Sequence, residues 1–248
     1  DDVLKPIFNE LELFSLAKRV FMIEHEENLV ETIHPEEVDY REITTVAERD
    51  ELLQKLKEAP EYVLNVIFGD GTIYNSYPDY LCFSTAVNTA CYLRLPSAKD
   101  KAEDVIRLFK PILEDQNKVL ISNDVKDDII WLRRAGVEIL NKIFDVKIAH
   151  YVLQPDSSHE LERVALEMLN YRLIKGDNTE NPQLSLFPDE GAKKDKDFAE
   201  RTDILFRLKE KLEEALQEVG LYKLYEEIEM PLVSVLADME YEGVSIDK

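Results

Sequence analysis

The residues of this sequence that could do chemistry start in the segment EYVLNVIFG, Glu61 to Gly69. Its run of Val, Leu, Ile and Phe predicts a strand buried on both faces, at the centre of a sheet covered by helices. Carboxylates on such a strand could hold catalytic metal ions, because Mg²⁺ prefers oxygen anions as ligands. The only polar side chain in the middle of this strand is Asn65, which carries no charge. The middle of this strand therefore offers no carboxylate for a metal ion.

The elements that must position this strand follow an α/β pattern. Thr44–Leu56 predicts a short strand followed by a helix. Downstream, the segments 80–87 and 89–95 predict an antiparallel meander with a tight turn near Asn88. Strands that alternate with helices then favour a mixed sheet. The remaining expected elements are a helix at 101–114, a strand at 118–122, a helix at 127–135 that ends at Gly136, a short strand near 144, and helices at 145–153, 159–169, 198–219 and 221–239.

The composition is that of a globular chain with a strong acidic bias. Its 52 Asp and Glu residues outnumber its 30 Lys and Arg residues, so the formal net charge is −22. Such a surface repels a phosphate backbone, and we expect DNA binding to be weak or to depend on neighbouring domains. No apolar segment reaches the ~18 residues of a membrane span, and no signal peptide is recognised. Cys82 and Cys91 fit reduced, buried thiols, so we expect a cytoplasmic protein that binds no membrane.

The end of the chain carries a specific resemblance. Residues 221–247, LYKLYEEIEMPLVSVLADMEYEGVSID, resemble the segment that joins the proofreading domain to the polymerase domain in bacterial DNA polymerase I, a family A polymerase. Upstream, Gly136-Val137, Phe144-Asp145 and the segment 149–153, AHYVL, also resemble the proofreading domain. The similarity covers roughly residues 40–248 by the order of the elements.

This resemblance implies a fold and a division of the chain. The fold is α/β: a ribonuclease H-like 3′-5′ exonuclease domain with a mixed five-stranded sheet flanked by helices, and helical N- and C-terminal extensions. Residues 1–40 would be a helical segment and linker from the preceding 5′-nuclease region. Residues 41–220 would form the exonuclease-like domain, and residues 221–248 would begin the polymerase domain. The first expected partner is therefore the remainder of the polymerase.

The residues that match the family's catalytic positions are mostly not acids. In active members three Asp and one Glu hold two Mg²⁺ or Mn²⁺ ions about 4 Å apart, and a Tyr orients the attacking water. The family's Asp-x-Glu motif falls on Asn65 and Ile67. Asp128 matches the Asp of the second motif. In the third motif Arg201 stands at the Asp position and Asp197 at the Tyr position, so Asp128 is the only acid retained.

We therefore expect no bound metal and the loss of exonuclease activity. A single carboxylate holds Mg²⁺ poorly, and Arg201 would place a positive charge where a cation belongs. We predict that an Asp128–Arg201 ion pair, or hydrogen bonds of Asn65, fill the former metal site. Alternatively, Asp128 is a helix N-terminal acid that interacts with the macrodipole, and Arg201 is a solvated charge. A slip of one or two residues in the third motif, to Phe198 or Asp203, would still leave the first motif without acids.

A second candidate site lies in the segment 176–197, which breaks every helical or strand periodicity and predicts a loop. The segment Gln183–Phe187, QLSLF, resembles the peptide by which proteins bind the bacterial sliding clamp. Leu184, Leu186 and Phe187 would fill an apolar pocket, and Gln183 would bind at its edge. Alternatively, the three apolar side chains fold back onto the domain.

Together these observations predict an exonuclease-like domain of a DNA polymerase I, in DNA replication and repair, that has lost metal-dependent proofreading. It would act as a scaffold and dock the sliding clamp. The alternative is an active two-metal 3′-5′ exonuclease that removes mismatched 3′-terminal nucleotides. A third reading, a DNA-binding module without chemistry, is disfavoured by the net charge of −22.

Overall fold

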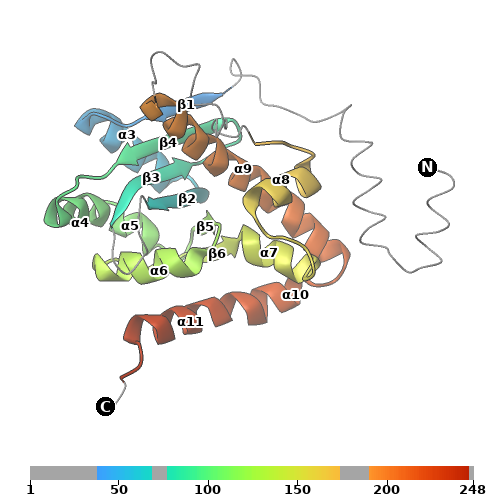
Figure 1. Cartoon of the computed structure of the whole chain (residues 1–248). Coiled ribbons are helices and arrows are strands. Elements are labelled where there is room, and N and C mark those ends of the chain that lie inside the picture. Colours follow the sequence, from blue (N-terminus) through green and yellow to red (C-terminus); the bar gives the residue numbers. More distant parts are fainter. Residues whose placement is uncertain (1–37, 69–76, 174–189, 246–248) are drawn as a thin grey trace, which may run out of the picture.

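The computed structural model describes residues 38–68, 77–173 and 190–245 (Figure 1). The expected helix at 1–35 and the clamp-like segment 183–187 lie outside these residues. The described part is a single sheet with helices on both faces, which confirms the expected α/β class. Within it, no helix is both long and apolar enough to cross a bilayer.

The sheet is mixed and has six strands in the order β1-β4-β3-β2-β5-β6. The strand predicted to be central is β2, which pairs antiparallel with β3 and parallel with β5. The expectation of five strands was wrong, because residues 39–42 add an edge strand parallel to β4 where we expected a linker. The strands are β1 (Asp39–Glu42), β2 (Glu61–Phe68), β3 (Pro78–Ser84), β4 (Thr89–Arg94), β5 (Val119–Ser122) and β6 (Lys142–Asp145).

The predicted antiparallel meander is confirmed. β3 and β4 pair antiparallel, and the turn between them contains Asn88 in the left-handed region at φ 64°. Asparagine tolerates this conformation better than most residues, which explains the tight turn at this position.

Most helices also begin and end close to the expected positions. The main difference is the long helix α9, which already begins at Glu190, so that residues 190–197 are helical rather than part of the expected loop. The helices are α3 (Val46–Glu58), α4 (Lys99–Arg107), α5 (Lys110–Leu113), α6 (Val125–Arg134), α7 (Val146–Leu153), α8 (Leu161–Leu169), α9 (Glu190–Glu218), α10 (Tyr222–Leu224), the π-helical turn η2 (Tyr225–Glu229) and α11 (Met230–Glu242).

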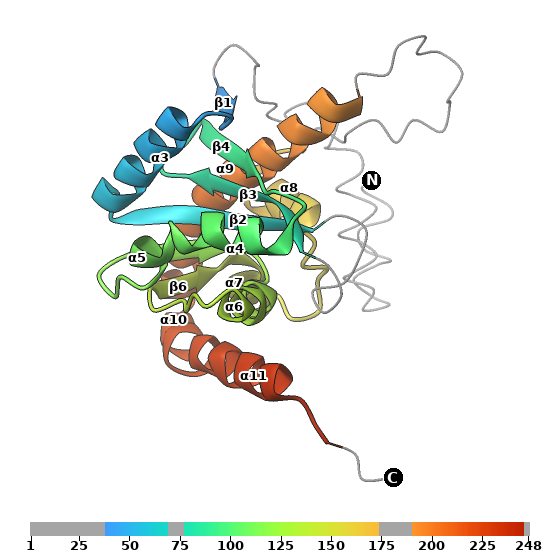
Figure 2. The ribbon, with the colours of Figure 1, turned by 90° about the vertical axis from the view of Figure 1, so that its left-hand side faces the viewer.

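Two apolar layers cover the two faces of the sheet. Because side chains alternate along a strand, Tyr62 and Leu64 of β2 face the layer formed with α3, α4, α5 and α6. Val63, between them, faces the layer formed with α7, α8 and α9. Figure 2 shows α4 in front of β2 and β3 and α9 behind them. The same alternation directs Asn65 and Ile67 toward α9, which decides the composition of the site.

The C-terminal segment is fastened to the sheet by Tyr225. Its hydroxyl accepts a hydrogen bond from the Asp145 N–H at 2.8 Å and donates one to the Asp145 carbonyl at 3.3 Å. Asp145 ends β6 and caps α7, where its carboxylate accepts the Ile148 N–H at 3.0 Å. Further along, α11 lies against α6 below the sheet, with Val233 and Ala237 buried between the two helices (Figure 1).

Replacing Tyr225 by Phe should lower the free energy of unfolding by about 1–2 kcal/mol, because a buried backbone N–H loses its acceptor while the ring still packs. Urea denaturation measures this loss. Tyr151→Phe, at a tyrosine on the surface, is the matched control and should change stability by less than about 0.5 kcal/mol. Equal effects of the two substitutions would contradict the role assigned to Tyr225.

Candidate active site

Asn65 and Ile67 lie on the face of β2 that meets α9. The Asn65 side chain is half-buried, and its Nδ2 donates to Thr202 Oγ1 at 3.3 Å. The Thr202 hydroxyl in turn donates to the Phe198 carbonyl one helical turn earlier, at 2.7 Å. The amide of Asn65 is therefore hydrogen-bonded to α9. This is one of the two arrangements predicted from the sequence.

Arg201 lies beside these residues on α9. Its guanidinium forms an ion pair with Glu162 of α8, and its Nε lies 3.7 Å from Asp197 Oδ2 on the same helix. Together with Asn65 and Ile67 it lines a pocket of about 190 Å³. The complete lining is Asn65, Ile67, Asn123, Lys147, His159, Glu160, Leu161, Glu162, Arg201 and Leu205. The residues that the resemblance placed at the acid positions of the first and third motifs thus line one pocket.

Asp128 lies outside this lining. It is buried in the first turn of α6, where its Oδ2 accepts a hydrogen bond from the Ser122 hydroxyl at 2.8 Å. Burial raises the pKa of its carboxyl well above the usual value, because water no longer solvates the charge. The predicted Asp128–Arg201 ion pair is wrong: Asp128 bonds to Ser122, whereas Arg201 pairs with Glu162 and Asp197.

Phe198 and Asp203, which a shifted third motif would supply, also contact other residues. The buried carboxylate of Asp203 accepts hydrogen bonds from the Tyr40 hydroxyl at 3.0 Å and the Asn88 N–H at 2.7 Å. It also pairs with Arg207 at 3.0 Å. These contacts direct Asp203 to β1 and the β3–β4 turn. The Phe198 ring packs on Tyr80, with centroids 5.4 Å apart.

The donor set of the pocket does not suit a pair of hard divalent cations. Mg²⁺ needs several oxygen ligands in octahedral geometry. The lining contains two carboxylates, Glu160 and Glu162, and that of Glu162 is paired with Arg201. Within residues 38–68, 77–173 and 190–245, no group of three or more His, Cys, Asp or Glu is arranged to hold a metal ion. That Asn65, Ile67 and Arg201 do not bind a metal ion therefore stays a prediction from their residue types.

Sequence reasoning missed most of the pocket, including all of its other polar residues. Asn123, Lys147, His159, Glu160 and Glu162 line it. None stands in a motif, since they come from the end of β5, from α7 and from the start of α8. The parallel order of β2, β5 and β6 brings these segments to one edge of the sheet. Only the position of Asn123 directly after a buried strand could have indicated its place.

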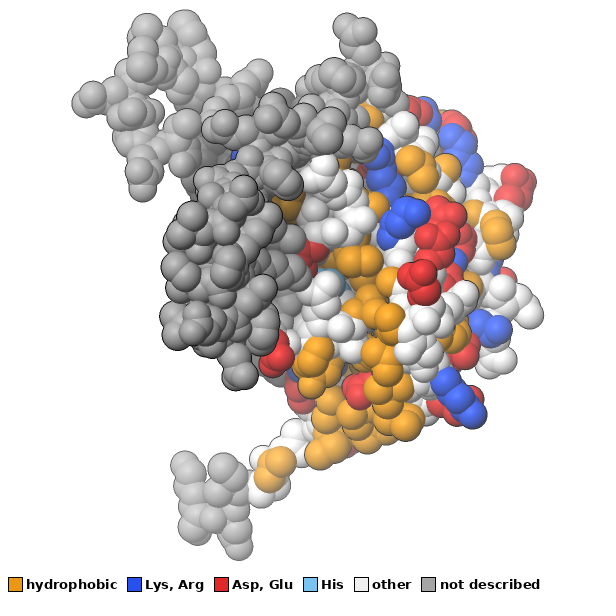
Figure 3. Space-filling model, turned by 90° about the vertical axis from the view of Figure 1, so that its right-hand side faces the viewer, with side chains coloured by type: hydrophobic (Ala, Val, Ile, Leu, Met, Phe, Trp, Pro, Cys, Tyr) orange, Lys and Arg blue, Asp and Glu red, His pale blue; other side chains and the backbone are white. Residues whose placement is uncertain are grey.

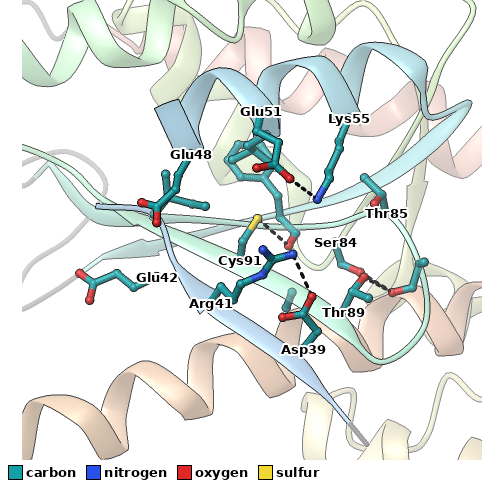
Figure 4. A pocket seen from close by; sticks show the side chains of 15 residues that line it. Asp39, Arg41, Glu42, Glu48, Glu51, Lys55, Ser84, Thr85, Thr89 and Cys91 are labelled. Carbon is teal, nitrogen blue, oxygen red and sulfur yellow. Dashed lines mark hydrogen bonds and ion pairs between the residues drawn. The ribbon is translucent and has the colours of Figure 1, made fainter. Parts of the chain in front are cut away.

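A second pocket, of about 220 Å³, lies between β1, α3 and the β3–β4 turn. Figure 4 shows that its cations point to neighbouring acids: Arg41 pairs with Asp39 and Lys55 with Glu51, both at 2.8 Å. Burial raises the pKa of the Cys91 thiol to about 12, so this thiol is protonated and a poor nucleophile at neutral pH. The pocket therefore offers less chemistry than the one at α9.

Comparison with known proteins places this geometry in a family. A family model described as 3′-5′ exonuclease matches residues 40–217. DNA polymerase I of Borreliella burgdorferi is 29% identical over an alignment of 230 residues, which covers 88% of this chain and 24% of that protein. The chain thus spans about a quarter of the length of the curated relatives it matches.

Solved structures share the fold at low identity. The POL domain of Pol1 from M. smegmatis, in complex with DNA primer-template and dNTP, has a TM-score of 0.65 at 18% identity. The match covers 84% of this chain and 33% of the M. smegmatis chain. Brucella melitensis NrnC has a TM-score of 0.60 at 18% identity. The match covers 85% of this chain and 98% of NrnC. The sheet, its helical layers and these likenesses define a ribonuclease H-like fold of the exonuclease class. The chain belongs to the 3′-5′ exonuclease family of DNA polymerase I.

Proposed function

We propose that this exonuclease domain has lost metal-dependent proofreading and serves as a scaffold within a DNA polymerase I. The observation that carries the proposal is the composition of one pocket: Asn65, Ile67 and Arg201 line it together. An ammonium or guanidinium at about 4 Å repels a cation by roughly 4 kcal/mol per charge at an effective dielectric constant near 20. Asp128, the one acid retained, is turned toward Ser122 instead of the pocket.

Incubated with a labelled single-stranded oligonucleotide in Mg²⁺ or Mn²⁺, the chain should release no more nucleotides than a buffer control. Asp128→Ala should not change this background rate, because the residue lies outside the pocket lining. In an active two-metal site the same substitution would lower the rate by orders of magnitude, because each ligand holds a metal ion that stabilises transition-state charge.

Metal-dependent cleavage that Asp128→Ala abolishes would instead support the alternative, an active two-metal 3′-5′ exonuclease that removes mismatched 3′-terminal nucleotides. The assay separates the two functions without knowledge of the neighbouring domains.

A second proposed function is docking to the bacterial sliding clamp through Gln183, Leu184, Leu186 and Phe187. These residues lie outside the described part of the structure, and the proposal rests on their sequence. An extended segment between Pro182 and Pro188 could place two leucines and an aromatic ring in an apolar pocket. Leu186→Ala with Phe187→Ala should weaken clamp binding by at least about tenfold, or 1.4 kcal/mol, in a surface plasmon resonance assay. Ser185→Ala is the control; unchanged binding by the double variant would end the proposal.

In the proposed scaffold the polymerase domain begins with residues 221–248, and α11 supports this division. One face of α11 packs on α6, while its opposite face exposes an apolar stripe. Figure 3 shows apolar side chains gathered at the lower end of the molecule, where α11 lies in Figure 1. The stripe consists of Leu232, Val235, Leu236 and Met239, each at least 41% exposed, and Ile228 of η2, which is also exposed, continues it. A helix that is apolar on both faces normally has both faces covered.

We expect the amides of α11 to exchange hydrogen more slowly in a longer chain that includes the following domain than in this chain alone. Equal exchange in the two chains would mean that the stripe is not covered by that domain. The cytoplasm remains the proposed location, in keeping with a partner that acts on DNA.

A further inference from the structure

The last helix of the structure, α11, is attached to the domain through a break in the helical hydrogen-bond pattern. Residues 222–242 run through α10, η2 and α11 without a loop between them. Within η2 the pattern is π-helical, and the Met230 N–H donates to the Tyr225 carbonyl five residues earlier. Pro231, in the first turn of α11, has no N–H, so one backbone hydrogen bond of the helix cannot form there. A π-turn and a proline are both features at which helices bend sharply.

The two sides of this break are held to the domain very differently. Before the break, Tyr225 is buried and its hydroxyl is hydrogen-bonded to both backbone groups of Asp145 in β6. After the break, only two of the 13 residues of α11, Val233 and Ala237, are buried. Figure 1 shows α11 as the lowest layer of the molecule, beneath α6, with the chain leaving the domain at its far end. A firm anchor therefore precedes the break, and a mostly exposed helix follows it.

Besides its two buried side chains, α11 is held on α6 by ion pairs. Lys126 Nζ lies 2.5 Å from Glu240 Oε1, and Arg133 Nη1 lies 2.6 Å from Asp238 Oδ1. The Arg133 guanidinium also lies over the Tyr241 ring, 5.3 Å from its centroid. The segment 230–242 contains three acids and no Lys or Arg, and the whole chain has a net charge of −22. The two cations of α6 therefore attract a negatively charged helix to an acidic domain.

These ion pairs hold the contact only weakly. The carboxylate side chains of Glu240 and Asp238 are 36% and 58% exposed, and ion pairs with such exposure stabilise a contact slightly. Asp127 and Asp124 also act on Lys126, although its hydrogen bond to Glu240 is the largest cause that raises the Lys126 pKa. Two small buried side chains and two exposed pairs leave the docked helix close to balance with an undocked one.

We propose that α11 is a hinged strap, which swings about η2 and Pro231 as one unit and is held closed on α6 by the ion pairs of Lys126 and Arg133. In the open state Tyr225 stays in place, and the face of α6 beneath the strap becomes exposed. The position of the strap sets the direction in which the chain leaves the domain. This device goes beyond the proposed loss of proofreading and is independent of the pocket beside α9.

The single tryptophan of the chain makes the motion measurable. Trp131 is buried in α6 and can serve as the donor for an energy acceptor attached to Ser234→Cys, at an exposed position of α11. Cys82 is buried, and burial raises the pKa of the Cys91 thiol to about 12, so a thiol-reactive label at neutral pH favours the new cysteine. The Trp131 fluorescence lifetime should have a short component for the closed strap and a long component for the open strap.

Replacing both cations of α6, in Lys126→Glu with Arg133→Glu, should raise the ratio of open to closed strap at least about tenfold, because two attractions become repulsions. Adding Asp238→Lys and Glu240→Lys to this variant restores both pairs with reversed sign. The ratio should then return to that of the natural residues, since a contact between the partners, and not the charge of either alone, holds the strap.

The matched control is Lys101→Glu with Lys211→Glu, at exposed positions on α4 and α9. It makes the same change in net charge and should leave the ratio unchanged. A second label position, Glu226→Cys in η2, tests the hinge: its Trp131 lifetime should be the same in all variants, because this turn is anchored. A ratio that the double reversal does not raise, a swap that does not restore it, or an equal change at position 226 would overturn the inference.

Discussion

Addition of Mn²⁺ should raise the melting temperature of the triple variant Asn65→Asp, Ile67→Glu, Arg201→Asp by about 5–11 °C and leave that of the natural chain unchanged. A ligand at one hundred times its dissociation constant stabilises the folded state by about 2.7 kcal/mol, and each kcal/mol shifts the melting temperature of a chain of this size by about 2–4 °C. The three positions line one pocket, so the new carboxylates would face one another and repel until a cation binds between them.

The single variant Arg201→Asp is the control for this experiment. It removes the guanidinium but adds only one acid, and one carboxylate binds Mn²⁺ weakly. Its melting temperature should therefore respond little to the metal. A large Mn²⁺ response of the natural chain would show that its present residues already hold metal, and the proposal of a lost site would be wrong. No response of the triple variant would mean that the pocket has also lost the shape of a metal site.

The buried carboxyl of Asp145 should contribute about 2 kcal/mol more to the free energy of unfolding at about pH 4.5 than at about pH 7. Burial raises the pKa of the Asp145 carboxyl from 3.8 to about 6, so the folded chain binds this proton more tightly than the unfolded chain. The stability that the proton provides is present below about pH 4 and is lost as the pH rises through about 6. Burial raises the pKa of Asp128 as well, and it acts in the same direction.

Urea denaturation at several pH values measures this dependence. Asp128→Asn keeps the shape of the side chain and its acceptor for Ser122 but removes the proton, so it should reduce the gain at acid pH. Asp156→Asn, at an exposed position, removes one charge from the surface and should leave the slope unchanged. Glu48 acts in the opposite direction, because hydrogen bonds from Thr45 and Thr44 lower its pKa to about 2. A slope that Asp128→Asn does not reduce would show that Asp128 already ionises in the folded chain.

Element types and their order followed from local pattern because the apolar periodicity of a segment reflects its burial. The run at β2 predicted its central place in the sheet, and the turn at Asn88 predicted the β3–β4 hairpin. Boundaries failed where the sequence is polar. The segment 39–42 forms β1 by pairing with β4, and its own side chains are mostly exposed, so no apolar pattern marks it as a strand. The first residues of α9 were assigned to a loop for the same reason.

The sequence by itself determined the side-chain types at this pocket: an amide at Asn65, a hydrocarbon at Ile67 and a guanidinium at Arg201, none of which is the carboxylate that Mg²⁺ prefers. Tertiary structure decided the partners of these groups. It turned Asp128 toward Ser122, paired Arg201 with Glu162, and joined His150 and His159 to Glu167. Such pairings depend on distances between segments far apart in the chain, and these distances follow from strand order and helix packing, which no local spacing encodes.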